Sequence, residues 1–411
     1  ALIDLRSERV DLRGDFVDLL PGISNVRIRG SYTDYQHDEV DGPILYSRYA
    51  NEVWDGRIEL THKSLFGFTG TLGVQYTDGT FSGLNLIDLH VPPTASFGFA
   101  GTQEYRTENI GVFLSERRSF GPVDIEIAAR KDWRTIKTPI PGEFYINLEE
   151  EYWGYYIDNY GDDWRQDVEQ ERRESFIASN PDRKHNPFSI SFGATWNVTD
   201  GYSLALSLAQ TERAPNVREL FADGSSLATN SYEVGLLATG FVQDYLPEDL
   251  FSYDDDVMER VRAINLTFRK AGGPLEFEVG AFYQDVDNYI FAHLLETEFT
   301  TGQRHDFLLY TTADAEFYGV DGEVSYQFDE SSQVTIFGDY VATNLTNDDD
   351  NLPRIPPGRL GARYAYAAGP ISGDIEYYRT FGQDKVALYE TPTDGYNMVN
   401  ATIAYTIDMA P

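Results

Sequence analysis

The chain has 411 residues, and its 67 Asp and Glu against 32 Lys and Arg give a formal net charge of −35, which argues against binding a nucleic-acid backbone by counterion release. It contains no cysteine, which excludes a disulfide framework and any thiolate metal site. It also has no apolar run of about 18 residues, which excludes a transmembrane helix but not a transmembrane β-barrel, whose strands are apolar only at alternate positions.

Alternation of apolar and polar residues dominates the chain wherever it is not obviously a loop. In residues 123–130, for example, one face carries Val123, Ile125 and Ile127 and the other carries Asp124 and Glu126, which predicts a strand with one wet face. Taken in chain order, the pattern predicts about fifteen strands that start near residues 2, 26, 52, 69, 108, 123, 188, 202, 261, 275, 316, 333, 359, 373 and 397.

The connections between these strands alternate in length. The short ones carry Gly, Pro or Ser turn residues and lie at 20–24, 64–67, 120–122, 197–201, 271–274, 329–332 and 368–370. The long ones lie at 36–51, 79–103, 135–187, 213–259, 286–315, 344–358 and 383–396. Outer-membrane barrels have short periplasmic turns and long outer loops. A soluble β-sandwich or propeller also buries one face, but it predicts neither this alternation nor strands of about ten residues, since sandwich strands centre on about five or six. We therefore predict an all-β fold, a transmembrane antiparallel β-barrel.

Candidate metal ligands occur in two places. Asp254, Asp255 and Asp256 form an acidic run in a long loop, which carboxylate-bound calcium would use but which also suits a solvated acidic surface. His37 and Glu39 lie two residues apart and so face the same side of a strand, which would suit zinc. The alternative for His37 is a strand-end histidine in ordinary hydrogen bonds.

Residues 212–235 read ERAPNVRELFADGSSLATNSYEVG, which resembles the signature of TonB-dependent receptor barrels. Residues 317–323 and 352–361 resemble later parts of the same family, and residues 32–39, 59–62 and 91–94 are similar to its zinc and iron receptors. The zinc type has Pro-His after the Gly of the signature, whereas Ser225 and Ser226 follow Gly224 here, so the resemblance to zinc receptors is incomplete.

The resemblance implies a 22-stranded barrel with an N-terminal plug, of which residues 1–411 would be a partial barrel of about fifteen strands with no plug domain. It implies an outer-membrane receptor of a Gram-negative bacterium that takes up a scarce nutrient, a metal ion or metal chelate such as zinc or an iron–siderophore. No catalytic motif such as a Ser-His-Asp order or a phosphate-binding loop is present, so we do not expect an enzyme. A passive porin or an anchoring barrel for surface components is the alternative, and a soluble carbohydrate-binding β-protein is a more distant one.

The implied partners are the TonB–ExbB–ExbD energy-transducing complex, which would act through the missing plug, together with outer-membrane lipid and lipopolysaccharide and a surface lipoprotein. No covalent cofactor is expected; a zinc ion, an iron chelate or calcium would be bound as ligand. The aromatic residues Tyr152, Trp153 and Tyr155 would stack on an aromatic siderophore or pack their loop. Arg213 and Glu219 belong to the signature, and they would bind ligand or shape the loop at the barrel mouth.

Overall fold

The computed structural model describes residues 2–85, 97–98, 103–137, 145–146, 159, 161, 170, 174, 178, 182–226, 231–237, 257–298, 304–346 and 350–407. Within these residues the regular structure is almost entirely β, with one short helix, α3 (Val217–Phe221). No helix in the described part of the chain is long and apolar enough to cross a membrane.

Fifteen strands of at least ten residues make up the wall of the described fold. They are β1 (Leu2–Val17), β2 (Ile23–Asp41), β3 (Ile44–His62), β4 (Thr69–Asn85), β6 (Gln103–Phe120), β7 (Val123–Lys137), β10 (Phe188–Thr199), β11 (Tyr202–Arg213), β14 (Glu259–Lys270), β15 (Leu275–Glu298), β16 (Arg304–Gln327), β17 (Ser332–Leu345), β18 (Arg359–Ala368), β19 (Ile371–Thr380) and β20 (Tyr396–Tyr405). The prediction of about fifteen antiparallel strands is confirmed.

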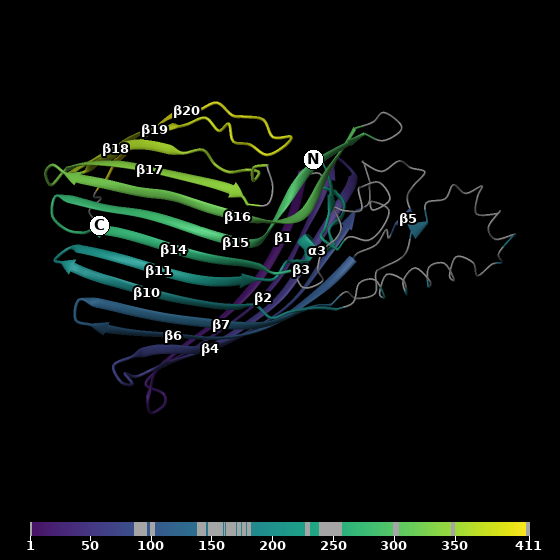
Figure 1. Ribbon diagram of the computed structural model, residues 1–411, viewed down its shortest axis with the longest axis horizontal. Helices are drawn as coiled ribbons and strands as arrows, with labels where there is room; N and C mark the ends of the chain where they lie inside the picture. Colours follow the sequence, from purple (N-terminus) through teal and green to yellow (C-terminus); the bar gives the residue numbers. More distant parts are fainter. Residues whose placement is uncertain are drawn as a thin grey trace.

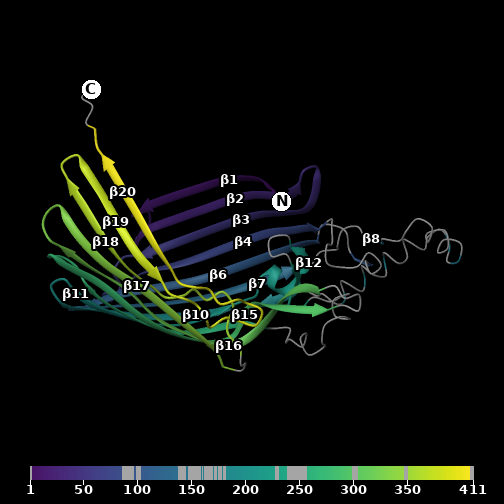
Figure 2. The same ribbon diagram turned by 90° about the horizontal axis from the view of Figure 1, so that it is seen from above.

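Each of these strands pairs antiparallel with the next one along the chain, as a meander does. The short strands β9 (Arg183–His185), β12 (Asp223–Ser226) and β13 (Ser231–Val234) join the same 18-stranded sheet, and β5 (Phe97–Gly98) pairs with β8 (Tyr145–Ile146). The sheet curves strongly from β1 round to β20, which form its two edges (Figure 2).

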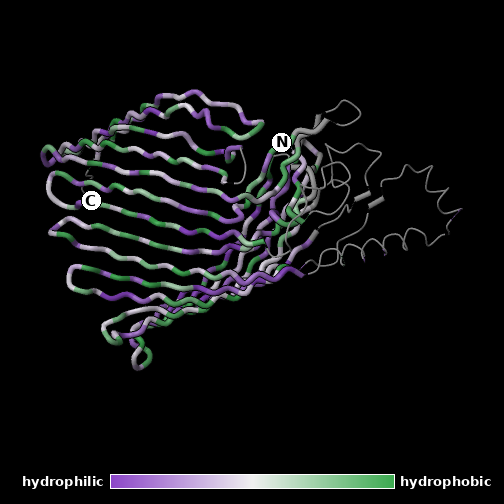
Figure 3. Tube along the Cα trace, viewed as in Figure 1, coloured by the Kyte–Doolittle hydropathy of each residue, from purple (hydrophilic) through white to green (hydrophobic). Residues whose placement is uncertain are grey.

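Hydrophobic and hydrophilic residues alternate along the strands (Figure 3), and so the two faces of the sheet differ in polarity. On β14, Ile264, Leu266 and Phe268 are all more than 40% exposed on the outer face, while Asn265 and Thr267 between them face the lumen. Large exposed apolar side chains of this kind recur on the outer face of strand after strand. An apolar outer face and a polar inner face are the arrangement of a transmembrane β-barrel.

Exposed aromatic side chains form two bands on the outer face. The band near the short turns contains Phe16, Phe120, Trp196, Tyr326, Tyr366 and Tyr405, and the band near the long loops contains Trp54, Tyr76, Trp133, Tyr283, Tyr318, Tyr340 and Tyr377. On β16 the bands lie eight residues apart, at Tyr318 and Tyr326, which spans about 20 Å at roughly 3.4 Å per residue and a tilt of about 40°. That distance matches the apolar band of an outer-membrane barrel, about 25 Å tall.

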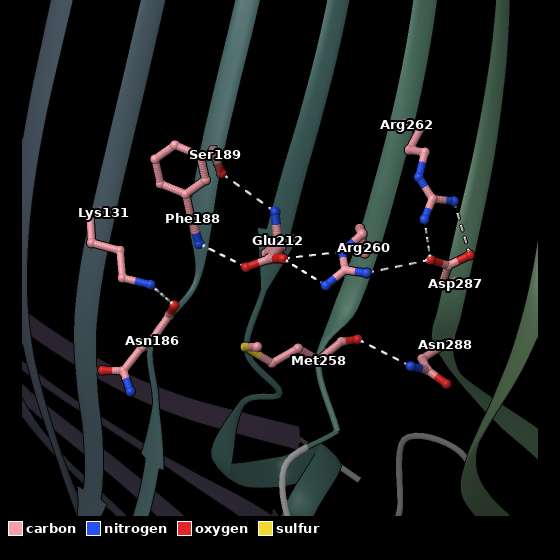
Figure 4. Close-up of polar contacts among 10 residues, drawn as sticks. All are labelled: Lys131, Asn186, Phe188, Ser189, Glu212, Met258, Arg260, Arg262, Asp287 and Asn288. Atoms are coloured by element: carbon pink, nitrogen blue, oxygen red, sulfur yellow. Dashed lines mark hydrogen bonds and ion pairs between the residues drawn. The ribbon is translucent and has the colours of Figure 1, made fainter.

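Charged residues occupy the outer face directly beyond the aromatic band on the side of the long loops, and Figure 4 shows the contacts of Glu212, Arg260, Arg262 and Asp287. Arg260 lies 2.9 Å from Glu212, and Arg262 lies 2.8 Å from both Asp285 and Asp287. Because buried charge in hydrocarbon is costly and these ion pairs are partly exposed, they mark the level at which the apolar layer ends.

Several strands are longer than predicted. The expected loop at 36–51 is a tight hairpin, because β2 runs to Asp41 and β3 begins at Ile44, and most of the expected loop at 286–315 belongs to β15 and β16. Beyond the lipid layer both faces of a strand meet water, so polar side chains occupy both and the period-two signal disappears although the backbone ladder continues.

Candidate functional site

The described parts of the signature segment, residues 212–226 and 231–235, lie at the mouth of the lumen, at the end of the sheet opposite the short turns (Figure 1). After β11, Ala214 and Pro215 are buried, and Asn216 caps α3. Asn216 accepts a hydrogen bond from the Glu219 N–H (2.9 Å), and the Glu219 carboxylate accepts one from the Asn216 N–H (2.8 Å), which completes a capping box. This reciprocal pair allows a helix of five residues to form at all.

Two ion-pair groups hold this segment together, and one of them also binds it to the wall. Arg213 donates to Glu219 (2.8 Å) and to Glu259 on β14 (2.9 Å). Arg218 on α3 donates through Nε to the buried Glu233 of β13 (2.7 Å) and makes a second bond to its other oxygen, and this carboxylate raises the pKa of Arg218 above its ordinary value. Charge-assisted pairs of this bidentate type fix orientation as well as contributing energy.

The last residue of the signature is Gly235, where the backbone passes too close to Leu220 for any side chain to fit. A Cβ at this position would lie 2.5 Å from the Leu220 carbonyl oxygen. The close approach lets the Leu236 N–H donate to the Glu219 carbonyl (2.8 Å) and the Leu237 N–H donate to the Leu220 carbonyl (2.8 Å). The glycine therefore ties the chain that follows β13 to α3.

A small apolar core lies between α3 and the wall. Phe221 stacks on Tyr105 of β6 with ring centroids 4.9 Å apart, and the cluster is completed by Ile136 on β7, Ile290 on β15, Leu220 and Leu236. Since β6 and β15 are well separated around the arc, the signature segment links distant parts of the wall. It is a rigid platform at the lumen mouth.

Beside this platform lies a cavity of about 450 Å³. Its walls come from the lumenal faces of β3, β4, β6 and β7, from the end of β11 with the residue after it, and from the residue before β10. The lining residues are Asn51, Val53, Thr77, Gly79, Phe81, Thr107, Asn109, Asp132, Arg134, Pro187, Glu212, Arg213 and Ala214. A concave site with an apolar floor and a few convergent polar groups is the usual form of a small-ligand pocket.

Arg213 and Glu219 therefore occur at the mouth, as the signature predicts, and there they form an ion pair that supports α3. Arg213 also lines the cavity. Whether either residue touches a ligand stays a prediction.

His37 and Glu39 both face the lumen, as their spacing predicts, but each has its own partner. The His37 Nδ1 lies 3.0 Å from the Tyr35 hydroxyl, and its ring stacks on Tyr49 with centroids 4.9 Å apart. Glu39 accepts a hydrogen bond from the Ser47 hydroxyl. Among the described residues, no group of three or more His, Asp or Glu is arranged to hold a metal ion.

Tyr152, Trp153, Tyr155 and the acidic residues Asp254, Asp255 and Asp256 lie outside the described residues. Their predicted roles in stacking and metal binding stay predictions.

Arg134, Asn109 and Asn51 were missed by reasoning from the sequence. All three face the lumen. The alternation of faces along a strand could have found them, because they are polar residues at lumenal positions near the long-loop ends of β3, β6 and β7. Asn109 and Arg134 are direct cross-strand partners. The predicted candidates came instead from loops, from the signature and from the end of one strand, at His37 and Glu39.

Comparisons with known proteins agree with this architecture. A family model described as TonB dependent receptor-like, beta-barrel matches residues 4–410. The copper transporter OprC is similar in structure, with a TM-score of 0.72 and 15% identity over 99% of this chain and 58% of its own. The FrpB iron transporter from Neisseria meningitidis (F3-3 variant) has a TM-score of 0.65 and 10% identity, over 97% of this chain and 56% of its own. The ferric citrate transporter FecA in its unliganded form has a TM-score of 0.62 and 13% identity, over 100% of this chain and 55% of its own.

At these identities the likeness to solved structures shows the shared fold. The chain spans 58% of the length of OprC and less of the other two. The family model covers nearly the whole chain, and so this protein belongs to the TonB-dependent receptor β-barrel family, a family of outer-membrane proteins.

Proposed function

We propose that this chain is the barrel wall of an outer-membrane receptor that imports a scarce metal ion or metal chelate. The observation that carries the proposal is the cavity at the lumen mouth, which is built against the family's signature segment on the rigid platform of α3. Solved structures with the same fold are named as transporters of copper, iron and ferric citrate. Family membership does not favour a passive porin.

The energy for import would come from the TonB–ExbB–ExbD complex, acting through a plug domain inside the lumen of the complete receptor. Outer-membrane lipid and lipopolysaccharide would contact the apolar outer face and the charged residues beyond its aromatic band on the side of the long loops. A surface lipoprotein would cover the mouth. The bound ligand would be an iron chelate, zinc or calcium.

The proposal is tested by uptake in the native host. We expect deletion of the complete gene to slow growth only when the right metal is limiting, and deletion of tonB to abolish the receptor-dependent part of uptake. The measurement is accumulation of labelled iron, zinc and copper, each offered free and as chelates. Unchanged uptake of every metal and chelate in the deletion strain would contradict the proposal.

A further inference from the structure

Arg134 stands out in the mouth cavity because the Nε of its guanidinium has no hydrogen-bond partner among the described residues. It lies on the lumenal face of β7, opposite Asn109 of β6 in the ladder. Its Nε is buried and has no hydrogen-bond partner, and none of the described residues forms an ion pair with it. A guanidinium has five N–H donors, and a buried donor left unsatisfied costs free energy that a ligand can recover.

Two carboxylates, Asp132 and Glu219, act electrostatically on Arg134, and both are bound to other groups. Asp132 accepts from both Nε and Nη2 of Arg130 (each 2.7 Å) and from the Asn109 amide (2.9 Å). Glu219 accepts from Arg213 (2.8 Å) and from the Asn216 N–H (2.8 Å). The described part of the wall therefore offers no free pair of oxygens to which the Arg134 fork could donate.

The surroundings of Arg134 suit an oxygen-rich ligand. Asn51, Thr77 and Thr107 line the same cavity with groups that donate and accept hydrogen bonds, and Phe81 and Val53 give it an apolar side. An arginine fork matches a carboxylate bidentately. The same positive charge repels a bare metal cation, so the cavity would favour a chelate that carries negative charge over the free ion.

We propose that Arg134 binds an anionic oxygen group, such as a carboxylate, of the metal chelate that the receptor imports. The inference rests on the proposed function and narrows its ligand to negatively charged chelates. A carboxylate side chain elsewhere in the complete receptor could bind Arg134 in the same way. The experiment therefore separates a carboxylate of the chelate from a carboxylate of the receptor.

The test measures chelate affinity of the complete purified receptor by titration calorimetry. The probes are two anionic chelates, ferric citrate and a ferric triscatecholate, and one neutral ferric trihydroxamate. The variants are Arg134→Gln, which removes the charge, and Arg134→Lys, which keeps the charge but loses the fork. Arg363→Gln is the matched control, because Arg363 is on the lumenal face of β18, outside the cavity, and only loosely paired with Glu376 (3.7 Å). Heat-modifiable gel migration establishes that each variant is folded.

We expect the receptor to bind at least one anionic probe, and Arg134→Gln to raise its Kd about tenfold or more, since a charge-assisted bidentate contact is lost. Arg134→Lys should raise it less, and Arg363→Gln should leave it unchanged. An unchanged Kd in Arg134→Gln, or wild-type binding of the neutral probe alone, overturns the inference and leaves the proposed function standing.

A lowered unfolding temperature of Arg134→Gln together with an equal loss of all probes would show that the partner is a side chain of the receptor, which also overturns the inference. If the wild-type receptor binds no metal and no chelate of any charge, the proposed function itself fails.

Discussion

At the scale of single residues, the family signature is explained by contacts within the mouth. Arg213 holds the Glu219 and Glu259 carboxylates, whose side chains are only 12% and 10% exposed, while Arg213 itself is 42% exposed. Without this cation two carboxylates with little access to water would lie near each other. The signature residues thus stabilise the platform next to the cavity.

Replacing Arg213 by alanine should therefore lower the free energy of unfolding by about 2 kcal/mol, less than a fully buried pair would cost because the arginine is partly exposed. Arg363→Ala is the control: its partner Glu376 is 3.7 Å away and both are partly exposed, so the loss should stay below about 1 kcal/mol. Urea unfolding in detergent measures both. If both variants lose the same free energy of unfolding, the Arg213 ion pairs stabilise the fold no more than the loosely paired Arg363 does.

Sequence reasoning named two residues of the mouth, whose binding of a ligand stays a prediction. Arg213 and Glu219 were predicted because the signature is local, with its cap, helix and ion pair within a few residues of one another. Arg134 was not predicted, because its environment depends on the register of four strands and on the fold of the segment after β11. Such placement is not encoded in any short stretch of sequence.

At the scale of strands, the lumenal face uses glycine opposite aromatic rings. Gly73, Gly319 and Gly361 are direct cross-strand partners of Phe113, Phe282 and Phe337. A Cβ on each glycine would lie 2.0, 2.7 and 2.6 Å, respectively, from its partner's ring. The ring lies over the glycine and covers the backbone that a side chain would otherwise shield, which is a known device for fixing strand register.

Gly73→Ala should accordingly destabilise the barrel by about 1–3 kcal/mol through overpacking, since the Phe113 ring must move and also contacts the Arg57 guanidinium, 4.3 Å from its centroid. Gly193→Ala on β10 is the matched control, because its Cβ would meet nothing closer than 3.9 Å. Unfolding midpoints in urea give the comparison. If the two variants have the same unfolding midpoint, the Phe113 ring does not need a glycine at position 73.

The strands themselves were largely predictable. The fifteen long strands were expected from period two, and those within the apolar layer begin within a few residues of prediction, as β4, β7 and β11 do. The ends of β2, β3, β15 and β16 that lie away from the short turns were predicted as loops, because polar residues occupy both faces there and leave no periodic signal.

At the scale of the whole molecule, the outer face has an apolar layer between two aromatic bands, and the lumen is polar with a structured mouth. These features define an orientation: short turns toward the periplasm, long loops and the cavity outward. Alternating loop length was enough to predict this orientation, but the contents of the mouth depend on contacts between distant strands. The central claim is that this sheet is a barrel wall embedded in lipid.

Nitroxide scanning along β16 tests that claim most directly, and these 411 residues contain no cysteine that would have to be removed before single-cysteine labelling. With the complete receptor in bilayers, oxygen accessibility at residues 318–326 should oscillate with period two. Its maxima should fall at the even positions, such as Val320 and Val324, which are 53% and 41% exposed on the outer face, and be highest near residue 322, midway between the aromatic bands. Maxima at the odd positions, or no dependence on depth, would contradict the account.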